Sequence, residues 1–204
     1  MTSLAERLAN YATSLQFEQL DELTVHEVRR RVIDSFACAL GAYRADAPQI
    51  ARRLAATVTG DPGARYLGGG AHRTSPEQAA FVNGVLFRYL DYNDTYLSLE
   101  PAHPSDNLAA ILAAAEVAGA SGKDVITAAV IAYEIQCRLC DSASIRARGW
   151  DHVTYGAFSA TAAVGRLLRL SPEQITHALN LAATPNVILS QTRAGELSNW
   201  KGCD

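Results

Sequence analysis

Residues 107–143, NLAAILAAAEVAGASGKDVITAAVIAYEIQCRLCDSA, decide the fold class of this chain. Alanine and long apolar residues fill two segments, 107–119 and 122–143, and these residue types favour helix because they lose little side-chain freedom there. Between the segments, Ser121 and Asp124 have the spacing of a helix N-cap and its reciprocal partner. The stretch therefore predicts two consecutive helices.

The same spacing of apolar residues continues on both sides of this stretch. Alanine makes up 36 of the 204 residues, and hydrophobic residues together make up 49%, a share typical of a chain that folds around a core. Apolar residues that recur every three or four positions predict helices. Six further helices are expected, at about residues 3–15, 24–40, 47–58, 154–169 and 173–184, and from near residue 76 to Asp91. We therefore expect one alanine-rich, all-α domain over residues 1–204.

Polar residues mark the starts of several of these helices. Thr24 and Glu27 have the spacing of a capping box, in which each residue satisfies a backbone N–H of the other. The tetrapeptide Ser-Pro-Glu-Gln occurs at 75–78 and again at 171–174. In both places it puts Ser at the N-cap, Pro at the first helical position and Gln at the reciprocal position. The glycine-rich segment 59–74 is expected to be a flexible connector.

The charge balance and the apolar runs exclude two classes of partner. The formal net charge is -3, so the chain has no general attraction to nucleic acid. No run approaches the roughly 18 to 20 apolar residues of a membrane helix, and the first residues lack the apolar core of a signal peptide. We therefore expect a cytoplasmic protein without a membrane partner. Its four cysteines are expected to be free thiols.

Two segments interrupt the helical pattern and are rich in reactive side chains. They are residues 91–107, DYNDTYLSLEPAHPSDN, and residues 185–204, PNVILSQTRAGELSNWKGCD. Polar loops on a rigid scaffold are where binding and catalytic residues gather. Asp91 and Asp94 would share one helix face if the preceding helix continued through them. The sequence therefore predicts a functional site built from these two segments.

The run from Arg88 to Glu116, RYLDYNDTYLSLEPAHPSDNLAAILAAAE, resembles the signature of the MmgE/PrpD family, and most closely the branch typified by 2-methylcitrate dehydratase. Three further blocks resemble family sequences in the same order: AYEI at 132–135, GWDH at 149–152 and LSNWKGC at 197–203. The family also includes cis-aconitate decarboxylase and an iminodisuccinate epimerase. The resemblance covers the whole chain.

The resemblance implies a large all-α domain followed by a smaller α+β lid domain, in a homodimeric enzyme whose active site lies between the domains. The site uses no metal and no cofactor. The residues that it implies for the pocket are Asp91, Thr95, His103, His152 and Lys201, and Asp94 is a further candidate for binding the substrate. Because family members are more than twice as long, residues 1–204 are expected to be an N-terminal part of the helical domain, incomplete at its C-terminus and without the lid.

The chemistry of these residue types agrees with dehydration of a small hydroxy-polycarboxylate. Such a reaction removes a C–H proton beside a carboxylate and protonates the leaving hydroxyl. His103 and His152 are candidate proton-transfer groups, because histidine gains or loses a proton near neutral pH. Lys201 is a candidate anchor for a substrate carboxylate, and Asp91 and Thr95 are candidate positioning groups. Epimerisation or decarboxylation would use similar groups and stays an alternative.

Other interpretations of the same residues stay open. Asp94 and Asp106 also fit as turn and capping residues beside the helix that follows. In an isoprenoid-synthase-like protein, Asp91 and Asp94 would hold magnesium and a diphosphate. In a third interpretation the chain is a non-catalytic helical half that binds a complementing chain. Cys137 and Cys140 form a single CxxC inside a predicted helix, for which core packing is favoured over metal ligation.

Overall fold

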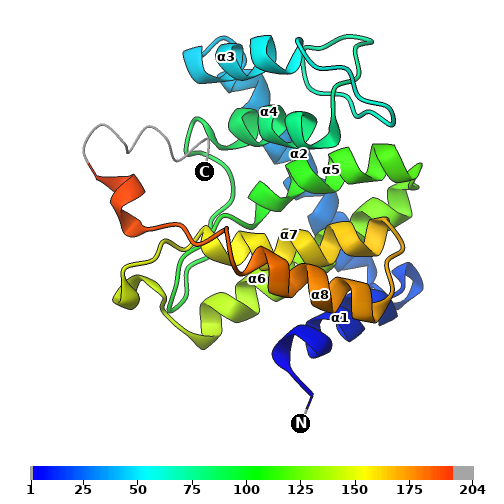
Figure 1. Cartoon of the computed structure of the whole chain (residues 1–204), viewed down its shortest axis with the longest axis vertical. Coiled ribbons are helices and arrows are strands. Elements are labelled where there is room, and N and C mark those ends of the chain that lie inside the picture. Colours follow the sequence, from blue (N-terminus) through cyan, green and yellow to red (C-terminus); the bar gives the residue numbers. More distant parts are fainter. Residues whose placement is uncertain (1, 195–204) are drawn as a thin grey trace.

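The computed structural model describes residues 2–194, which form eight α-helices and four short 3-10 helices (Figure 1). The α-helices are α1 Leu4–Ser14, α2 Glu22–Ala42, α3 Asp46–Ala55, α4 Pro76–Arg88, α5 Asn107–Ala118, α6 Gly122–Ser142, α7 Thr154–Leu167 and α8 Pro172–Ala182. The 3-10 helices are η1 Phe17–Gln19, η2 Pro104–Asp106, η3 Arg146–Arg148 and η4 Ser190–Arg193. Within this range the β structure consists of isolated bridges, which confirms the all-α prediction.

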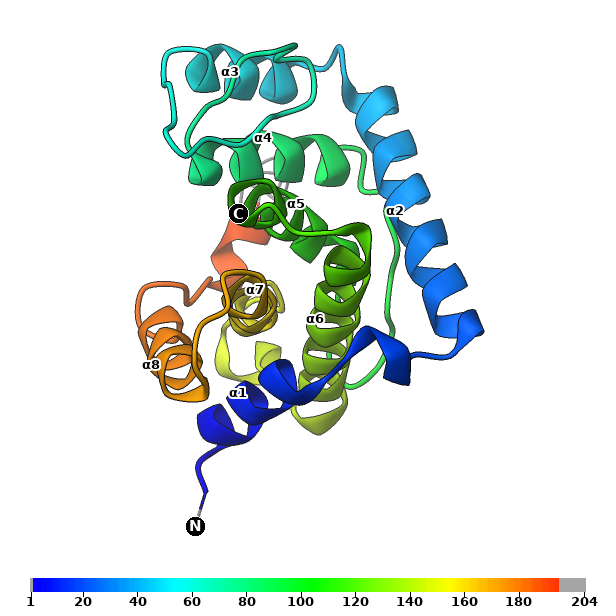
Figure 2. The ribbon, with the colours of Figure 1, turned by 90° about the vertical axis from the view of Figure 1, so that its right-hand side faces the viewer.

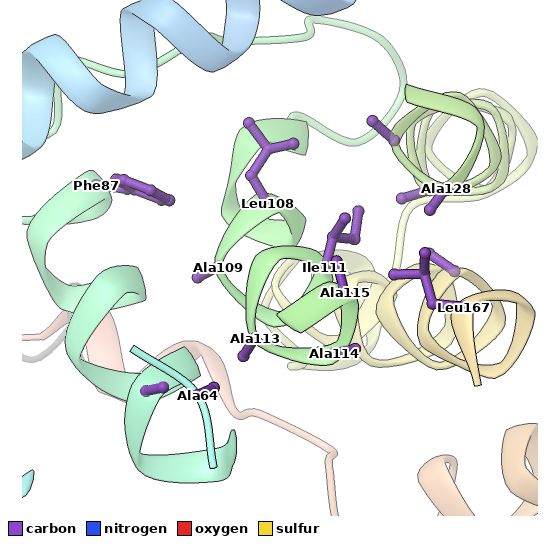
Figure 3. Packing of buried hydrophobic residues seen from close by; sticks show 14 of the residues in the cluster. Ala64, Phe87, Leu108, Ala109, Ile111, Ala113, Ala114, Ala115, Ala128 and Leu167 are labelled. Carbon is purple, nitrogen blue, oxygen red and sulfur yellow. The ribbon is translucent and has the colours of Figure 1, made fainter. Parts of the chain in front are cut away.

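Helix α5 lies at the centre of the fold, packed between α4 and α7 and also against α6 (Figure 2). The long helix α2 runs beside α4 and α6, while α1 and α8 pack together and against α7. Figure 3 shows Leu108 and Ile111 of α5 between Phe87 of α4 and Leu167 of α7. The segment that decided the fold class is therefore also the segment around which the other helices pack.

Small side chains let these helices approach closely, and a few large ones fill the space between them. Phe87, Leu108 and Ile111 are at most 1% exposed, and burial of each such side chain stabilises the fold by about 1.5–3 kcal/mol. The core cluster around them contains many buried alanines. Alanine supplies little apolar area, but it costs no side-chain entropy in a helix.

A buried polar network ties the starts of α5 and α7 to α6. Asn107 donates its side-chain N–H to the side-chain oxygen of Gln136 at 2.5 Å, and Ser159 donates its hydroxyl to the side-chain oxygen of Asn107 at 2.7 Å. All three side chains are at most 3% exposed. Because buried polar groups are costly without partners, this network fixes how the three helices meet.

The predicted helices are present, with differences at their ends. The six predicted at 3–15, 47–58, 107–119, 122–143, 154–169 and 173–184 lie within three residues of the observed bounds. The Ser121 and Asp124 capping box is present at the start of α6. None of the helices among residues 2–194 combines the length and the apolar character needed to cross a membrane.

The predicted start of α2 was wrong. The helix begins at Glu22 with Asp21 as its N-cap, three residues before the expected cap Thr24, and the Asp21 carboxylate accepts the backbone N–H of Thr24 at 2.7 Å. Glu27 pairs instead with Arg31 at 2.5 Å on the helix surface. Asp21 comes before Thr24 in the sequence, and aspartate is at least as good an N-cap as threonine. The helix therefore starts directly after Asp21, whose carboxylate accepts a backbone N–H of the first turn.

The two Ser-Pro-Glu-Gln sequences behave differently. Ser171 forms the full capping box with Gln174 at the start of α8, which confirms the prediction there. Ser75 is the N-cap of α4, but its side chain makes no capping hydrogen bond. The prediction of a second capping box was therefore wrong, although both helices begin at the expected proline.

Helix α4 ends at Arg88, earlier than predicted. Asp91 then adopts a left-handed backbone conformation with φ of 54°, which an α-helix of L-residues does not accommodate. The helix does not continue through Asp91 and Asp94, so the condition under which they would share a helix face is not met. The early end of α4 releases residues 89–103 to form the loop that carries the candidate site.

Candidate active site

Two histidines from distant parts of the sequence face each other. His103 directly precedes η2, and His152 lies just before α7. The centres of their imidazole rings are 5.8 Å apart, with ring planes inclined by 55°. Both rings are largely buried, with 14% and 10% of their side-chain surface exposed. The structure thus brings together the two candidate proton-transfer groups.

The loop that carries His103 is closed by a short antiparallel bridge. Tyr96 and Ala102 exchange two backbone hydrogen bonds, each 2.9 Å long. The loop is also attached to α6, because the Tyr96 and Ser98 hydroxyls donate to the Asp141 carboxylate at 2.8 and 2.6 Å. The position of His103 is therefore set by local pairing and by one long helix.

Glu100 joins this loop to the segment that leads to His152. Its carboxylate is fully buried and accepts hydrogen bonds from the Ser144 hydroxyl at 2.8 Å and the Arg146 backbone N–H at 3.2 Å. The Arg146 guanidinium pairs with the same carboxylate, and the Glu100 N–H donates to the Cys140 carbonyl at 3.1 Å. We name this set of contacts the Glu100 clasp.

The contacts of His103 decide which nitrogen can accept a proton. Nδ1 lies 2.8 Å from the Asp94 carbonyl oxygen, and since a carbonyl can only accept, Nδ1 carries the hydrogen of the neutral ring. The Thr95 hydroxyl lies 3.4 Å from the same nitrogen. Nε2 is therefore the basic nitrogen, and it lies 4.0 Å from the Asp91 carboxylate. Burial and the nearby Arg88 charge lower the pKa of His103 below its usual range, so the ring is neutral at neutral pH.

Asp91 is held by a buried arginine. Arg88 is 5% exposed and donates from Nη1 to the Asp91 carboxylate. The same Nη1 lies 3.5 Å from the Asn93 side-chain oxygen, and Nε lies 3.9 Å from the Asp106 carboxylate. Arg88 therefore balances two acidic side chains at the end of α4.

The Asp94 carboxylate fixes the loop through hydrogen bonds to both of its oxygens. One carboxylate oxygen accepts the Ser105 backbone N–H at 3.0 Å, and the other accepts the Tyr133 hydroxyl at 2.7 Å. Burial and the charge on Asp94 raise the pKa of Tyr133, so Tyr133 remains a donor. With both oxygens used in this way, Asp94 shapes the backbone that presents its own carbonyl to His103.

The structure contradicts the interpretation of Asp106 as a side-chain cap. Asp106 precedes α5, but its carboxylate makes no capping bond and instead accepts the Asn93 amide at 2.8 Å. Burial raises the pKa of Asp106 to about 7, although 31% of the side-chain surface remains open to solvent. The magnesium interpretation is also disfavoured by geometry, because Asp91 and Asp94 direct their carboxylates to different protein partners.

His152 sits in a second ion-pair network. Arg193 of η4 binds the buried Asp151 carboxylate through two hydrogen bonds of 2.7 and 2.8 Å. Nδ1 of His152 lies 3.3 Å from Asp151, and Nε2 lies 3.5 Å from the Arg193 guanidinium. Burial, partly opposed by Asp151 and assisted by Arg193, lowers the pKa of His152 to about 4. His152 is therefore also neutral at neutral pH.

The predicted site residues fall into three groups. Asp91, Thr95, His103 and His152 lie together around the two facing rings. Asp94 contacts His103 through its backbone carbonyl, and Lys201 lies outside the described residues.

Arg88, Asp151 and Arg193 were missed as members of the site. Arg88 and Asp151 stand inside the quoted RYLDY and GWDH blocks, but only the fold shows that they are buried and which side chains they pair with.

A cavity of about 320 Å³ opens beside the buried arginine. Its polar lining residues are Arg88, Asp106, Asn107, Gln136 and Asn186, and the rest of the lining is apolar and mostly small, apart from Phe81 and Ile188. The volume is sufficient for a small polycarboxylate, since sites for small molecules begin at about 300 Å³. Arg88 joins this cavity to the candidate site, because Asp91, Thr95 and the two histidines are not among the described residues that line it.

The described residues contain no group of three His, Cys, Asp or Glu side chains placed to hold a metal ion. Cys137 and Cys140 lie in α6, where Cys140 is fully buried against Ala102, Ile145 and Tyr155. Burial raises the pKa of Cys140 to about 12, so it remains a thiol that packs in the core. This agrees with the packing role predicted for the CxxC pair.

The comparison with known sequences decides which family has this arrangement. The sequence model of the MmgE/PrpD N-terminal domain matches residues 6–204. The chain belongs to the MmgE/PrpD family. The histidine pair, the buried Arg88 and the loop between α4 and α5 are therefore features of an MmgE/PrpD N-terminal domain.

Curated relatives of this MmgE/PrpD chain are named as dehydratases. It is 32% identical to 2-methylcitrate dehydratase of Cupriavidus necator, with 95% of this chain and 42% of the relative aligned. It is 37% identical to 2-methylcitrate dehydratase of Escherichia coli strain K12, over 74% of this chain and 33% of the relative. A probable 2-methylcitrate dehydratase of Saccharomyces cerevisiae is 31% identical, over 89% and 39% of the two chains. The chain thus spans about two fifths or less of these relatives.

Proposed function

We propose that this chain supplies the helical part of a dehydratase that acts on a small hydroxy-polycarboxylate such as 2-methylcitrate. The observation that carries the proposal is the pair of neutral, facing histidines beside Asp91 and Thr95. The names of the relatives support the substrate class. Residues 1–204 are proposed to be one domain, with the rest of the active site supplied by sequence outside it.

In this proposal His103 removes the C–H proton. Its Nδ1 hydrogen is held by the Asp94 carbonyl, so the lone pair on Nε2 points to the side of Asp91 and is ready to accept. A neutral imidazole is already in the accepting form at neutral pH. The electron pair left by the proton forms the new carbon–carbon double bond as the hydroxyl departs.

The leaving hydroxyl needs a proton to depart as water. The proton that His103 removes from carbon can supply it: His152 faces His103 and is neutral, and we assign it to accept this proton and pass it to the hydroxyl, so that proton and hydroxyl leave together as water. Lys201 is proposed to hold a substrate carboxylate, and Asp91 and Thr95 are proposed to orient the substrate. The reaction requires no metal or cofactor in this assignment.

Single substitutions of the two histidines test the proposal in the protein expressed from its complete reading frame. His103→Gln and His152→Gln are each expected to lower kcat for 2-methylcitrate by about 10² to 10⁴, the usual contribution of a proton-transfer group. Absorbance of the conjugated carboxylate product follows the reaction. His177→Gln is the matched control, because His177 is exposed on α8; its rate should equal that of the unaltered protein.

The same assay separates the alternatives. Release of carbon dioxide or inversion at a carbon centre, without the conjugated product, would identify a decarboxylase or an epimerase. Unaltered rates in both histidine variants would contradict the assignment of proton transfer to His103 and His152.

A further inference from the structure

The guanidinium of Arg88 occupies an unusual position for an arginine at the end of a helix. Only 6% of its side-chain surface is exposed; it lines the cavity and pairs with Asp91, whose carboxylate lies 4.0 Å from Nε2 of His103. Burial of a charged group is costly unless it is paired. Its acidic neighbours are Asp91, to which Nη1 donates, and Asp106, 3.9 Å from Nε. Among the described residues Nε makes no hydrogen bond.

The backbone at Asp91 shows that this pairing constrains the chain. A left-handed φ of 54° is uncommon for a residue other than glycine, although aspartate is among the residues that adopt it most readily. The Asp91 N–H also donates to the Arg88 carbonyl at 3.0 Å, so a backbone hydrogen bond and a side-chain ion pair join the same two residues. The result is a carboxylate fixed 4.0 Å from Nε2 of His103.

We propose that Arg88 is a positioning residue that holds the Asp91 carboxylate beside Nε2 of His103 and thereby sets the proton affinity of that nitrogen. The catalytic part of this inference rests on the proposed function, whereas the electrostatic part does not. Arg88 acts through Asp91 and through its charge, and His103 is the group that meets the substrate.

The charges around His103 act in opposite directions. Burial and the positive charge of Arg88 favour the neutral ring, while Asp91 and the Asp94 carboxylate favour the protonated ring. His152 faces His103 from the start of α7, and the Asp151 and Arg193 pair lies behind it. Asp106, on the far side of Arg88, is the remaining acidic group of this set.

Nuclear magnetic resonance titration of the histidine ring protons tests the electrostatic part without any substrate. Arg88→Gln removes the positive charge but keeps donors for Asp91, so the pKa of His103 is expected to rise. Asp91→Asn removes the negative charge and tolerates the left-handed backbone, so the pKa is expected to fall. Arg88→Lys keeps the charge and should stay near the parent value.

The control for charge removal is Arg138→Gln, because Arg138 is an exposed arginine of α6 that pairs with Glu134. Its effect on the His103 titration should be absent. An unchanged His103 titration in both Arg88→Gln and Asp91→Asn would overturn the inference. If Arg88→Gln does not fold, Arg88→Lys and Asp91→Asn still decide, because the inference requires no shift of the His103 pKa with Lys and a lower pKa with Asn; a shifted pKa with Lys or an unchanged one with Asn would contradict it.

Kinetics of the protein from its complete reading frame test the catalytic part. In Arg88→Gln, kcat is expected to fall about 100-fold, the order expected when a reacting group is misplaced, with a smaller change in KM. The acidic limb of the pH profile of kcat/KM should move to higher pH in Arg88→Gln, whereas in Arg88→Lys it should lie near its position in the parent protein. A merely structural role would lower the amount of folded enzyme without moving this limb.

The two proposals fail in different ways. If the His103 titration shifts as expected but the parent protein does not dehydrate 2-methylcitrate, the proposed function is wrong and the role of Arg88 in the electrostatics stands. If the parent protein is active and neither the titration nor the pH limb responds to Arg88→Gln, the inference about Arg88 is wrong and the proposed function stands.

Discussion

The imidazole of His152 combines burial with two positive neighbours. Burial lowers its pKa to about 4, and the charges of Arg193 and Arg88 act in the same direction. In the unfolded chain the same group would titrate near its ordinary value of about 6.5. Between these two values the unfolded chain binds a proton that the folded chain does not bind, so the folded state loses stability as the pH falls.

We therefore predict that the free energy of unfolding increases between about pH 4 and about pH 6.5. A difference of about 2.5 pKa units corresponds to at most about 3 kcal/mol from His152. Urea unfolding of the parent protein and of His152→Gln at each pH measures this contribution. The free energy of unfolding of the parent minus that of the variant should show the rise, because the variant lacks the titrating group.

Asp106 makes the comparison with the variant necessary. Its pKa is raised to about 7 in the folded chain, so its contribution has the opposite sign and is lost as the pH rises. The parent curve alone therefore combines two opposing slopes. A difference curve that stays flat over this range would contradict the pKa assigned to His152.

At the scale of one residue, the sequence predicted which side chains meet but not what holds them. The LDYND, HPSDN and GWDH blocks indicated Asp91, His103 and His152, and the structure brings these three together. Arg88 and Asp151 look like ordinary surface charges in the sequence. Their burial depends on packing between segments far apart in the chain, which no local pattern reports.

At the scale of the helix, the two Ser-Pro-Glu-Gln starts offer a matched pair. Ser171 accepts the Gln174 N–H at 3.3 Å and its own N–H is satisfied by the Gln174 side chain at 2.8 Å. Ser75 has the same neighbours in sequence but makes no capping hydrogen bond. A comparison of the two helix starts therefore measures what the capping hydrogen bonds contribute, because the tetrapeptide is the same in both.

Ser171→Ala is expected to lower the free energy of unfolding by about 1 kcal/mol, the usual cost of removing an N-cap side chain. Ser75→Ala should cost less, because no cap bond is lost there. Chemical denaturation of both variants at the same pH measures the two values. Equal losses in the two variants would show that the capping bonds do not account for the difference between the helices.

The helix ends show what local patterns leave undetermined. The positions of the helices followed from apolar spacing and alanine, whereas two ends were wrong. The start of α2 depended on a choice between Asp21 and Thr24, two caps of similar strength. The end of α4 coincides with the left-handed backbone of Asp91 and its pairing with Arg88, an arginine that is buried only in the folded structure.

At the scale of the whole molecule, α2 presents apolar side chains to solvent. Ile33 and Leu40, two helical turns apart on one face, are 69% and 74% exposed. Leu90 is 43% exposed and lies against Gly41 at the end of the same helix. Exposed large apolar side chains grouped on one helix favour association. A second copy and a complementing chain both remain proposals for the partner.

We predict that the chain associates in solution through this face of α2. Light scattering at increasing protein concentration should give a mass above that of a monomer, and Ile33→Glu with Leu40→Glu should lower it. Leu181→Glu on α8 is the control, since Leu181 is 72% exposed on another helix. A monomeric mass for the parent protein at all concentrations would contradict self-association.

The Glu100 clasp also has a consequence for how the two histidines fluctuate. Because it binds the His103 loop to the segment that precedes His152, we expect the clasp to open as one event rather than as two independent loop movements. Amide hydrogens of Tyr96 and Ala102 in one segment and of Arg146 in the other should then exchange with solvent deuterium at related rates. Such a shared opening would change the distance between the two rings, and it can be measured far from either imidazole.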